Sequence, residues 1–224
     1  MQRTPASAWR PCGSRLALAA AAVWSVAVAA GFAVLWKYKT TPGHEEIATP
    51  IEWPVDAALA RSPRRATLLM FAHPKCTCTR ASIAELAQLM TRVHDRLDSA
   101  VLFLAPRDEG TVWTASELWA SAARIPGVRV IRDEEGREAT RFGVMTSGGV
   151  VLYDGRGRLL FKGGITPARG HEGDSFGRER IVSLLTTGAA DRADAPAFGC
   201  ALKGDEPRRL AQIAAPIGNQ GEQR

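Results

Sequence analysis

Cys76 and Cys78 are the residues whose type and spacing suit chemistry at sulfur. Only Thr77 separates them, and they lie between a short apolar run and an amphipathic segment that begins near Thr79. The thiolate is the reactive form of cysteine, and backbone N–H groups at a helix N-terminus stabilise it. The pattern therefore favours thiol–disulfide exchange or the binding of a soft metal ion.

An uncharged segment near the N-terminus indicates the compartment in which these thiols work. Residues 16–36 carry no charge and are mostly Ala, Val and Leu, a length that suits a helix crossing about 30 Å of hydrocarbon. The basic residues that precede it, with no acidic residue among them, are Arg3, Arg10 and Arg15. The positive-inside rule then keeps residues 1–15 in the cytoplasm and sends the rest across the membrane. We favour this anchor over a signal peptide cleaved near Ala27 and Ala29.

Charge gives no support to nucleic-acid binding. The chain has 224 residues and a formal net charge of +6, and residues 1–40 hold five basic residues and no acidic one. The remainder is therefore nearly neutral and lacks a basic stripe. With 46% hydrophobic and 23% charged residues, the composition is that of an ordinary globular protein.

The cysteine count favours chemistry over structural disulfides. Cys12 precedes the predicted span, so the membrane would separate it from the other three. Cys76, Cys78 and Cys200 remain in a compartment where disulfides persist. Because three is an odd number, at least one thiol is free or pairs transiently.

The hydrophobic pattern predicts alternating strands and helices beyond residue 63. Strands are expected over short apolar runs at 66–72, 100–105, 128–131, 150–153 and 159–163. Helices are expected at 81–97, 114–123, 135–141 and 175–186, the second opened by a capping box of Thr114 and Glu117. This order predicts an α/β sandwich with a central mixed sheet, preceded by one transmembrane helix.

The same pattern divides the chain into parts. Residues 37–63 contain several prolines and are expected to form an extended linker that lifts the domain off the membrane. The folded domain is expected over 64–187. Residues 188–224 are rich in Ala, Gly and Pro, and this loop-rich tail carries Cys200.

Residues 71–80, in which a strand, Pro74, the cysteine pair and a helix follow in that order, resemble the active-site turn of the thioredoxin-like superfamily. The resemblance covers about residues 64–186 and is to membrane-tethered envelope members, including the RedB-like branch. It implies a thioredoxin-like fold. It also implies that Cys76 takes the place of the nucleophilic first cysteine and Thr79 the place of the second.

The chain departs from the thioredoxin-like pattern at two positions. The second thiol is at Cys78, one residue early, and a disulfide between Cys76 and Cys78 would be strained and easily reduced. Cys200 is the other candidate resolving thiol, because a floppy tail could return it to the site. Gly148 stands where thioredoxin-like folds carry a cis-proline, which implies that substrates are not bound in the usual way.

Three further side chains are expected to support the site. His73 and Lys75 flank Cys76 and would favour its thiolate by charge. His171 follows the predicted hairpin and is expected to approach the cysteine turn from the same edge.

The leading prediction is a membrane-anchored thiol–disulfide oxidoreductase that acts, without a cofactor, on protein thiols or disulfides of the cell envelope. Its catalytic residues would be Cys76, Cys78 and Cys200. The alternative is a copper-binding metallochaperone or assembly factor whose ligands are Cys76, Cys78 and His171, or His73 in place of His171. Peroxidase chemistry ranks below both, and a domain with purely structural cysteines is the remaining possibility.

Overall fold

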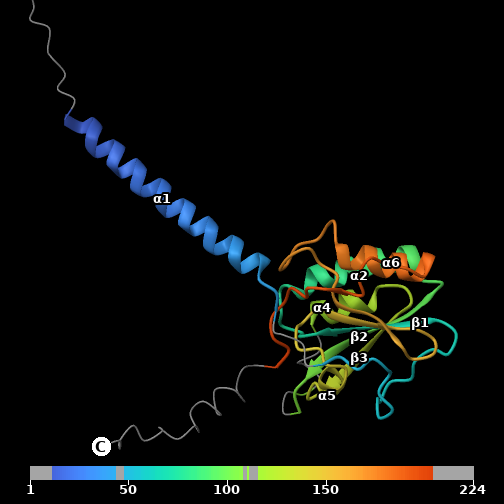
Figure 1. The fold of residues 1–224 in the computed structure, drawn as a ribbon. Coiled ribbons are helices and arrows are strands. Elements are labelled where there is room, and N and C mark those ends of the chain that lie inside the picture. Colours follow the sequence, from blue (N-terminus) through green and yellow to red (C-terminus); the bar gives the residue numbers. More distant parts are fainter. Residues whose placement is uncertain (1–11, 44–47, 108–109, 111–115, 204–224) are drawn as a thin grey trace, which may run out of the picture. The chain divides into compact units, whose positions relative to one another are not determined.

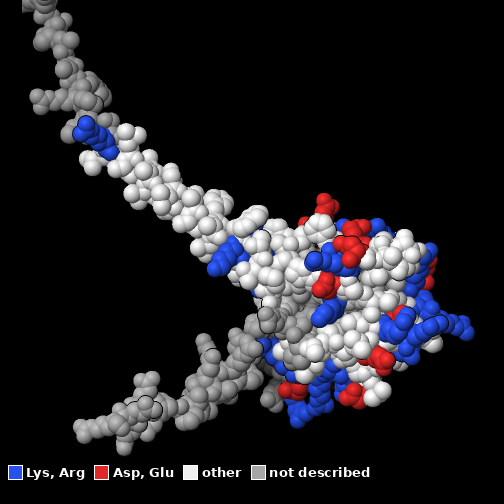
Figure 2. Space-filling view, in the orientation of Figure 1, with Lys and Arg blue, Asp and Glu red and all other residues white. Residues whose placement is uncertain are grey.

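The computed structural model describes residues 12–43, 48–107, 110 and 116–203, and the chain divides into two units, Met1–Thr40 and Thr41–Arg224. Helix α1 of the first unit spans Cys12–Thr40 (Figure 1). Its stretch Arg15–Thr40 is long and apolar enough to cross a membrane. Figure 2 shows an uncharged surface along this helix between basic residues at its two ends.

The second unit is built around the central strand β1 (Ala66–Ala72). β2 (Leu97–Ala105) pairs with β1 in parallel, and β3 (Val128–Glu134) pairs with β2 in parallel. These three strands form one half of the sheet. Parallel neighbours need a crossover on a face of the sheet, and helices supply it here.

Antiparallel strands form the other half of the sheet. β4 (Gly149–Tyr153) pairs with β1, and β5 (Leu159–Gly164) forms a hairpin with β4. The short strand β6 (Asp194–Ala195) then pairs with β5 in parallel. The complete order is β3-β2-β1-β4-β5-β6, a six-stranded mixed sheet among the described residues.

Helices cover both faces of this sheet (Figure 1). One face packs against α2 (Thr79–Val93), α4 (Glu117–Ala123) and α6 (Phe176–Thr187), whose apolar residues share one core cluster. The opposite face packs against the short helix α5 (Arg137–Arg141).

Each face of β1 contributes to a different core. Leu68 and Met70 lie in the cluster under α2, whereas Leu69 and Phe71 lie in the cluster on the α5 side. Successive side chains of a strand point to opposite faces, so a strand covered on both faces has a nearly continuous apolar run. The arrangement β1-α2-β2 followed by the β4-β5 hairpin and α6, with β1 in the centre, is thioredoxin-like. The predicted fold class is therefore confirmed.

Two helix boundaries differ from the prediction by three residues or more. α2 ends at Val93 rather than 97, because Leu97 belongs to β2 and packs into the same cluster as α2, which prolongs the helical periodicity across the turn. Thr114, the expected cap of the second helix, lies outside the described residues. Ser116 caps α4 instead, accepting a hydrogen bond from the Trp119 N–H at 3.2 Å.

Residues 48–63 pack on the domain, which corrects the expectation that this part of residues 37–63 forms an extended linker. The ring centroid of Trp53 lies 5.0 Å from that of Phe142 and 5.3 Å from that of Tyr153. The Tyr153 hydroxyl donates to the Pro50 carbonyl at 2.8 Å. The prolines of this stretch indicated an extended chain, but Trp53 and Leu59 complete the core on the α5 side. The compact unit accordingly begins at Thr41 rather than at 64.

Candidate functional site

The turn after β1 positions the first two cysteines. β1 ends at Ala72 and α2 begins at Thr79, with Cys78 at its N-cap position. Within the turn the Cys76 N–H donates to the His73 carbonyl at 3.1 Å, and the Thr79 N–H donates to the Cys76 carbonyl at 3.1 Å. The positive end of the helix dipole therefore lies beside both thiols.

Cys200 reaches the same place because its segment pairs with the loop before β4. The Ser147 N–H donates to the Cys200 carbonyl at 2.8 Å, and the Leu202 N–H donates to the Met145 carbonyl at 2.9 Å. Ala201 completes an antiparallel bridge with Thr146. We name residues 199–202 the tail segment. The expectation of a floppy tail is wrong for this segment, because backbone hydrogen bonds and the buried Leu202 side chain hold it in place.

Two residues outside the cysteine set secure the tail segment. Gly199 is buried so close to the loop that a Cβ atom on it would lie 2.0 Å from the Ser147 carbonyl oxygen, which excludes any side chain. The Arg169 guanidinium donates to the Gly199 carbonyl and also to the Thr41 carbonyl at 3.3 Å. Arg169 thus ties the tail segment to the start of the folded unit.

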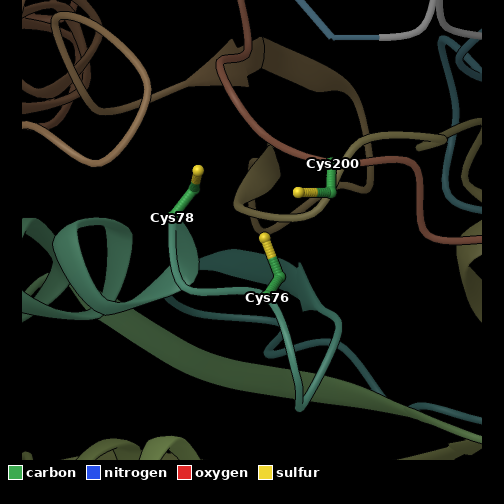
Figure 3. A group of neighbouring side chains, drawn as sticks. All are labelled: Cys76, Cys78 and Cys200. Carbon is green, nitrogen blue, oxygen red and sulfur yellow. The ribbon is translucent and has the colours of Figure 1, made fainter.

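The outcome is a cluster of three thiols from two distant parts of the chain. The sulfur atoms of Cys76, Cys78 and Cys200 all lie within 4.8 Å of one another. Figure 3 shows the first two side chains on the turn and helix start and the third on the tail segment, lining one small space. All three are free cysteines, the first two buried and Cys200 exposed.

Cys76 has the environment of a nucleophile. Burial raises the pKa of its thiol, but hydrogen bonds from the Thr79 hydroxyl and from Cys200 outweigh burial and hold the pKa below its ordinary value. Cys76 is therefore the member of the cluster that ionises first, and the thiolate is the form that attacks disulfides and binds metals.

The hydrogen bond from Thr79 to Cys76 has a defined direction. The His73 N–H donates to the Ser147 hydroxyl oxygen at 2.8 Å, and the Ser147 and Thr79 hydroxyl oxygens are 2.7 Å apart. An N–H can only donate, and each hydroxyl has one proton to donate. With the Cys76 thiolate as the final acceptor, Ser147 therefore accepts from the His73 N–H and donates to Thr79, and Thr79 donates to Cys76. Thr79 and Ser147 are both fully buried, so water does not compete for these bonds.

The other two thiols stay protonated more readily. Burial and the neighbouring Cys76 raise the pKa of Cys78. The same two causes raise the pKa of Cys200 to about 12, while the charge of Arg169 opposes the rise at both thiols. The cluster therefore combines one activated sulfur with two reserve thiols.

The flanking charges contribute differently from what the sequence suggested. His73 is half-buried, and burial followed by the nearby Lys75 charge lowers its pKa, which favours the neutral ring. Its Nδ1 atom accepts a hydrogen bond from the Lys75 N–H at 3.1 Å. His73 supports the site through its backbone N–H, and the bonds that favour the Cys76 thiolate come from Thr79 and Cys200.

The structure places His171 outside the thiol cluster. A Cβ atom on Gly170 would lie 4.0 Å from the Cys78 Cα, so the loop does approach the turn. His171 itself is exposed, and its Nδ1 atom lies 3.0 Å from the Arg169 carbonyl. In the described residues the group of mutually close potential ligands contains Cys200 where the sequence suggested His171.

Gly148 meets a backbone requirement that proline cannot meet. Its N–H donates to the Phe71 carbonyl at 2.7 Å, and proline has no N–H. Its φ of +88° and a would-be Cβ 2.4 Å from the Ser82 hydroxyl oxygen also exclude other side chains. The loop opposite the cysteines is therefore anchored to β1 by a hydrogen bond at this position.

Sequence reasoning missed Ser147, Arg169 and Gly199 as parts of the site. Ser147 precedes Gly148, the position at which the proline is missing. Its hydroxyl, beside that position, was the one signal that could have indicated a hydrogen bond at the site. Arg169 and Gly199 act through backbone carbonyls of distant segments, and neither residue type nor spacing indicates such contacts.

The fold and the site together define a thioredoxin-like domain with a three-cysteine cluster at the end of its central strand. No protein-family model matches the chain, and no curated protein matches it. Solved structures do match. An uncharacterised conserved protein of Geobacillus kaustophilus is 15% identical with a TM-score of 0.53, the match covering 74% of this chain and 94% of that one.

Two other solved structures also match. A hypothetical protein of Sinorhizobium meliloti is 19% identical with a TM-score of 0.51, over 63% of this chain and 80% of that one. A secreted disulfide oxidoreductase of Mycobacterium tuberculosis is 12% identical with a TM-score of 0.38, over 56% of this chain and 83% of that one. At these identities the similarity concerns the fold alone, and it does not single out the RedB-like branch.

Proposed function

We propose that the protein is a membrane-anchored thiol–disulfide oxidoreductase that acts on protein thiols or disulfides outside the cytoplasm. The observation that carries this proposal is the Cys76 thiol, whose pKa is lowered by hydrogen bonds and which has two further sulfurs within 4.8 Å. An activated thiol next to a second thiol is what exchange through a mixed disulfide requires.

The exchange proceeds in two balanced steps. The Cys76 thiolate attacks one sulfur of a disulfide in the partner protein, forming a mixed disulfide and expelling the other partner sulfur as a thiolate, which takes up a proton. Cys200 then loses its proton and attacks the Cys76 sulfur, which releases the second partner thiol. The partner gains two electrons and two protons, and this protein is left with a disulfide between Cys76 and Cys200. The same steps in reverse oxidise a partner dithiol.

Cys200 suits the resolving role better than Cys78. Both its backbone and its side chain hydrogen-bond to Cys76, whereas a bridge between residues 76 and 78 would strain the turn. Cys78 then takes no covalent part in the exchange.

The membrane location rests on α1 and on the distribution of charge. The helix is apolar enough to cross a membrane, and the residues before it are basic without acidic neighbours. The positive-inside rule keeps such a terminus in the cytoplasm and the thiol cluster on the other side, where disulfides persist.

Thiol trapping tests the proposal. Full-length protein is exposed in cells to oxidant or reductant, quenched with acid, alkylated and mapped for disulfides. We expect Cys200→Ser to accumulate mixed disulfides with partner proteins, Cys76→Ser to form none, and Cys78→Ser to resolve them as the unmodified chain does. A cluster whose oxidation state does not respond to either treatment contradicts the proposal.

A further inference from the structure

The thiol cluster has the composition of a soft-metal site. Three sulfur atoms from Cys76, Cys78 and Cys200 lie within 4.8 Å of one another. A metal–sulfur bond of about 2.3 Å puts the three sulfurs of a planar site about 4 Å apart, so the cluster needs only a small contraction to enclose an ion. We infer that the reduced protein binds one Cu(I) ion through these three thiolates.

The ligand set favours Cu(I) over structural zinc and over hard metal ions. Within the part of the chain that the structure describes, the group holds three sulfurs and no imidazole or carboxylate. Structural zinc sites are four-coordinate and tetrahedral, and a three-sulfur group lacks the fourth protein ligand. Soft thiolates select Cu(I), whereas magnesium and calcium require oxygen ligands.

Nearby positive charge offsets the charge of such a site. Three thiolates around a monovalent ion carry a net charge of −2. The charge of the Arg169 guanidinium opposes the rise in the pKa of both Cys78 and Cys200, so it favours their anionic forms. The N-terminus of α2 adds a further positive potential beside Cys78.

The third ligand is positioned before any metal arrives. The backbone hydrogen bonds between Cys200 and Ser147, and between Leu202 and Met145, hold the tail segment against the loop. The entropy of bringing a distant cysteine to the turn is therefore lost on folding rather than on binding. Cu(I) binding releases the protons of Cys78 and Cys200, so the affinity rises with pH.

Competition for Cu(I) tests the site on full-length, detergent-solubilised protein with its thiols reduced and oxygen excluded. The probe is Cu(I) alone, titrated against a chromophoric Cu(I) chelator, and X-ray absorption counts the sulfur neighbours of the ion. We expect one Cu(I) with three sulfurs. Cys78→Ser and Cys200→Ser should each leave two sulfurs and lower the affinity by about a hundredfold or more. His171→Ala is the matched control and should change neither.

Several outcomes overturn the inference. The inference fails if the protein does not compete with the chelator for Cu(I), or if it binds Zn(II) more tightly than Cu(I). It also fails if His171→Ala lowers the affinity for Cu(I), because His171 would then be a ligand. Circular dichroism of each variant separates loss of a ligand from loss of the fold. The inference is independent of the proposed exchange, because Cu(I) binding is measured on purified, reduced protein in the absence of any partner disulfide. Cys78→Ser separates the two, since it should weaken Cu(I) binding while the Cys76–Cys200 disulfide still forms.

Discussion

The two chain segments that build the thiol cluster are positioned in different ways. Cys76 and Cys78 lie between β1 and α2, and residues of the turn itself hydrogen-bond to one another. Cys200 depends on the tail segment, which pairs by backbone bonds with a loop more distant in sequence. Local structure positions the thiols of Cys76 and Cys78, whereas tertiary contacts position the thiol of Cys200.

The difference separates two properties of the site. The pKa of Cys76 depends first on burial and on Thr79, which begins the adjoining helix. The supply of a resolving thiol or third ligand depends on Gly199 and Leu202, which seat the tail segment. A substitution in one segment should therefore change one property more than the other.

Gly199→Val should produce the largest effect. A Cβ atom at this position would lie 2.0 Å from the Ser147 carbonyl oxygen, so the tail segment must move away. Overpacking of this kind costs about 1–3 kcal/mol. We expect Cys200 to be alkylated roughly tenfold faster or more, measured by mass spectrometry of maleimide-treated, reduced protein.

The control for this substitution is Gly110→Val, because a Cβ atom there meets nothing within 4 Å. It should leave the alkylation rate of Cys200 unchanged. Equal rates for Gly199→Val and the unmodified chain would mean that the tail segment does not hold the thiol in place.

Thr79→Val should act on Cys76 while leaving the tail segment seated. The substitution keeps the shape of the side chain but removes the hydroxyl that donates to the Cys76 thiolate, so the pKa of Cys76 rises. Hydrogen bonds to charged groups contribute about 1.5–3 kcal/mol, so alkylation of Cys76 at neutral pH should slow by roughly tenfold. Stopped-flow alkylation against pH measures both changes. Thr79→Ser keeps the hydroxyl and should restore the rate, and a failure to do so would assign the effect to packing.

This comparison also explains how much the sequence could predict. The turn could be read because a buried strand, a cysteine pair and an amphipathic helix are consecutive, and periodicity reports local structure. The position of Cys200 could not be read, since backbone carbonyls and N–H groups are present in every residue and carry no sequence signal. Residues 48–63 were misread for a similar reason, because their prolines are consistent with an extended chain whether or not Trp53 packs on the core.

Tyr153→Phe tests that second tertiary contact. The hydroxyl donates to the Pro50 carbonyl at 2.8 Å, and the ring stays in place in the variant. Loss of one hydrogen bond should lower the free energy of unfolding by about 1 kcal/mol. Chemical denaturation of the reduced protein measures it, and the alkylation rates of the three cysteines should not change. A change at Cys200 alone would show that residues 48–53 and the tail segment are coupled.

The smallest expected effect is the alkaline dependence of stability that Cys200 introduces. Burial and the adjacent Cys76 raise the pKa of Cys200 from its ordinary value of 9.0 to about 12 in the folded protein. A group whose pKa is raised by folding stabilises the fold fully below its unfolded pKa, and this contribution is lost as the pH rises from 9.0 towards 12. Because Cys200 as a residue is exposed and its thiol is only partly buried, solvent screening keeps the effect small.

Cys200→Ser removes this contribution and keeps a hydroxyl in the place of the thiol that donates to Cys76. The difference in unfolding free energy between the reduced unmodified chain and Cys200→Ser should be constant below pH 9. Above pH 9 the unmodified chain should lose stability relative to the variant. Tyr153, whose pKa burial raises to about 12, is present in both proteins and cancels. A difference that does not change with pH would mean that the Cys200 thiol ionises as easily in the folded chain as in the unfolded one. The tail segment would then position the sulfur without burying it, and the local turn alone would account for the chemistry of the cluster.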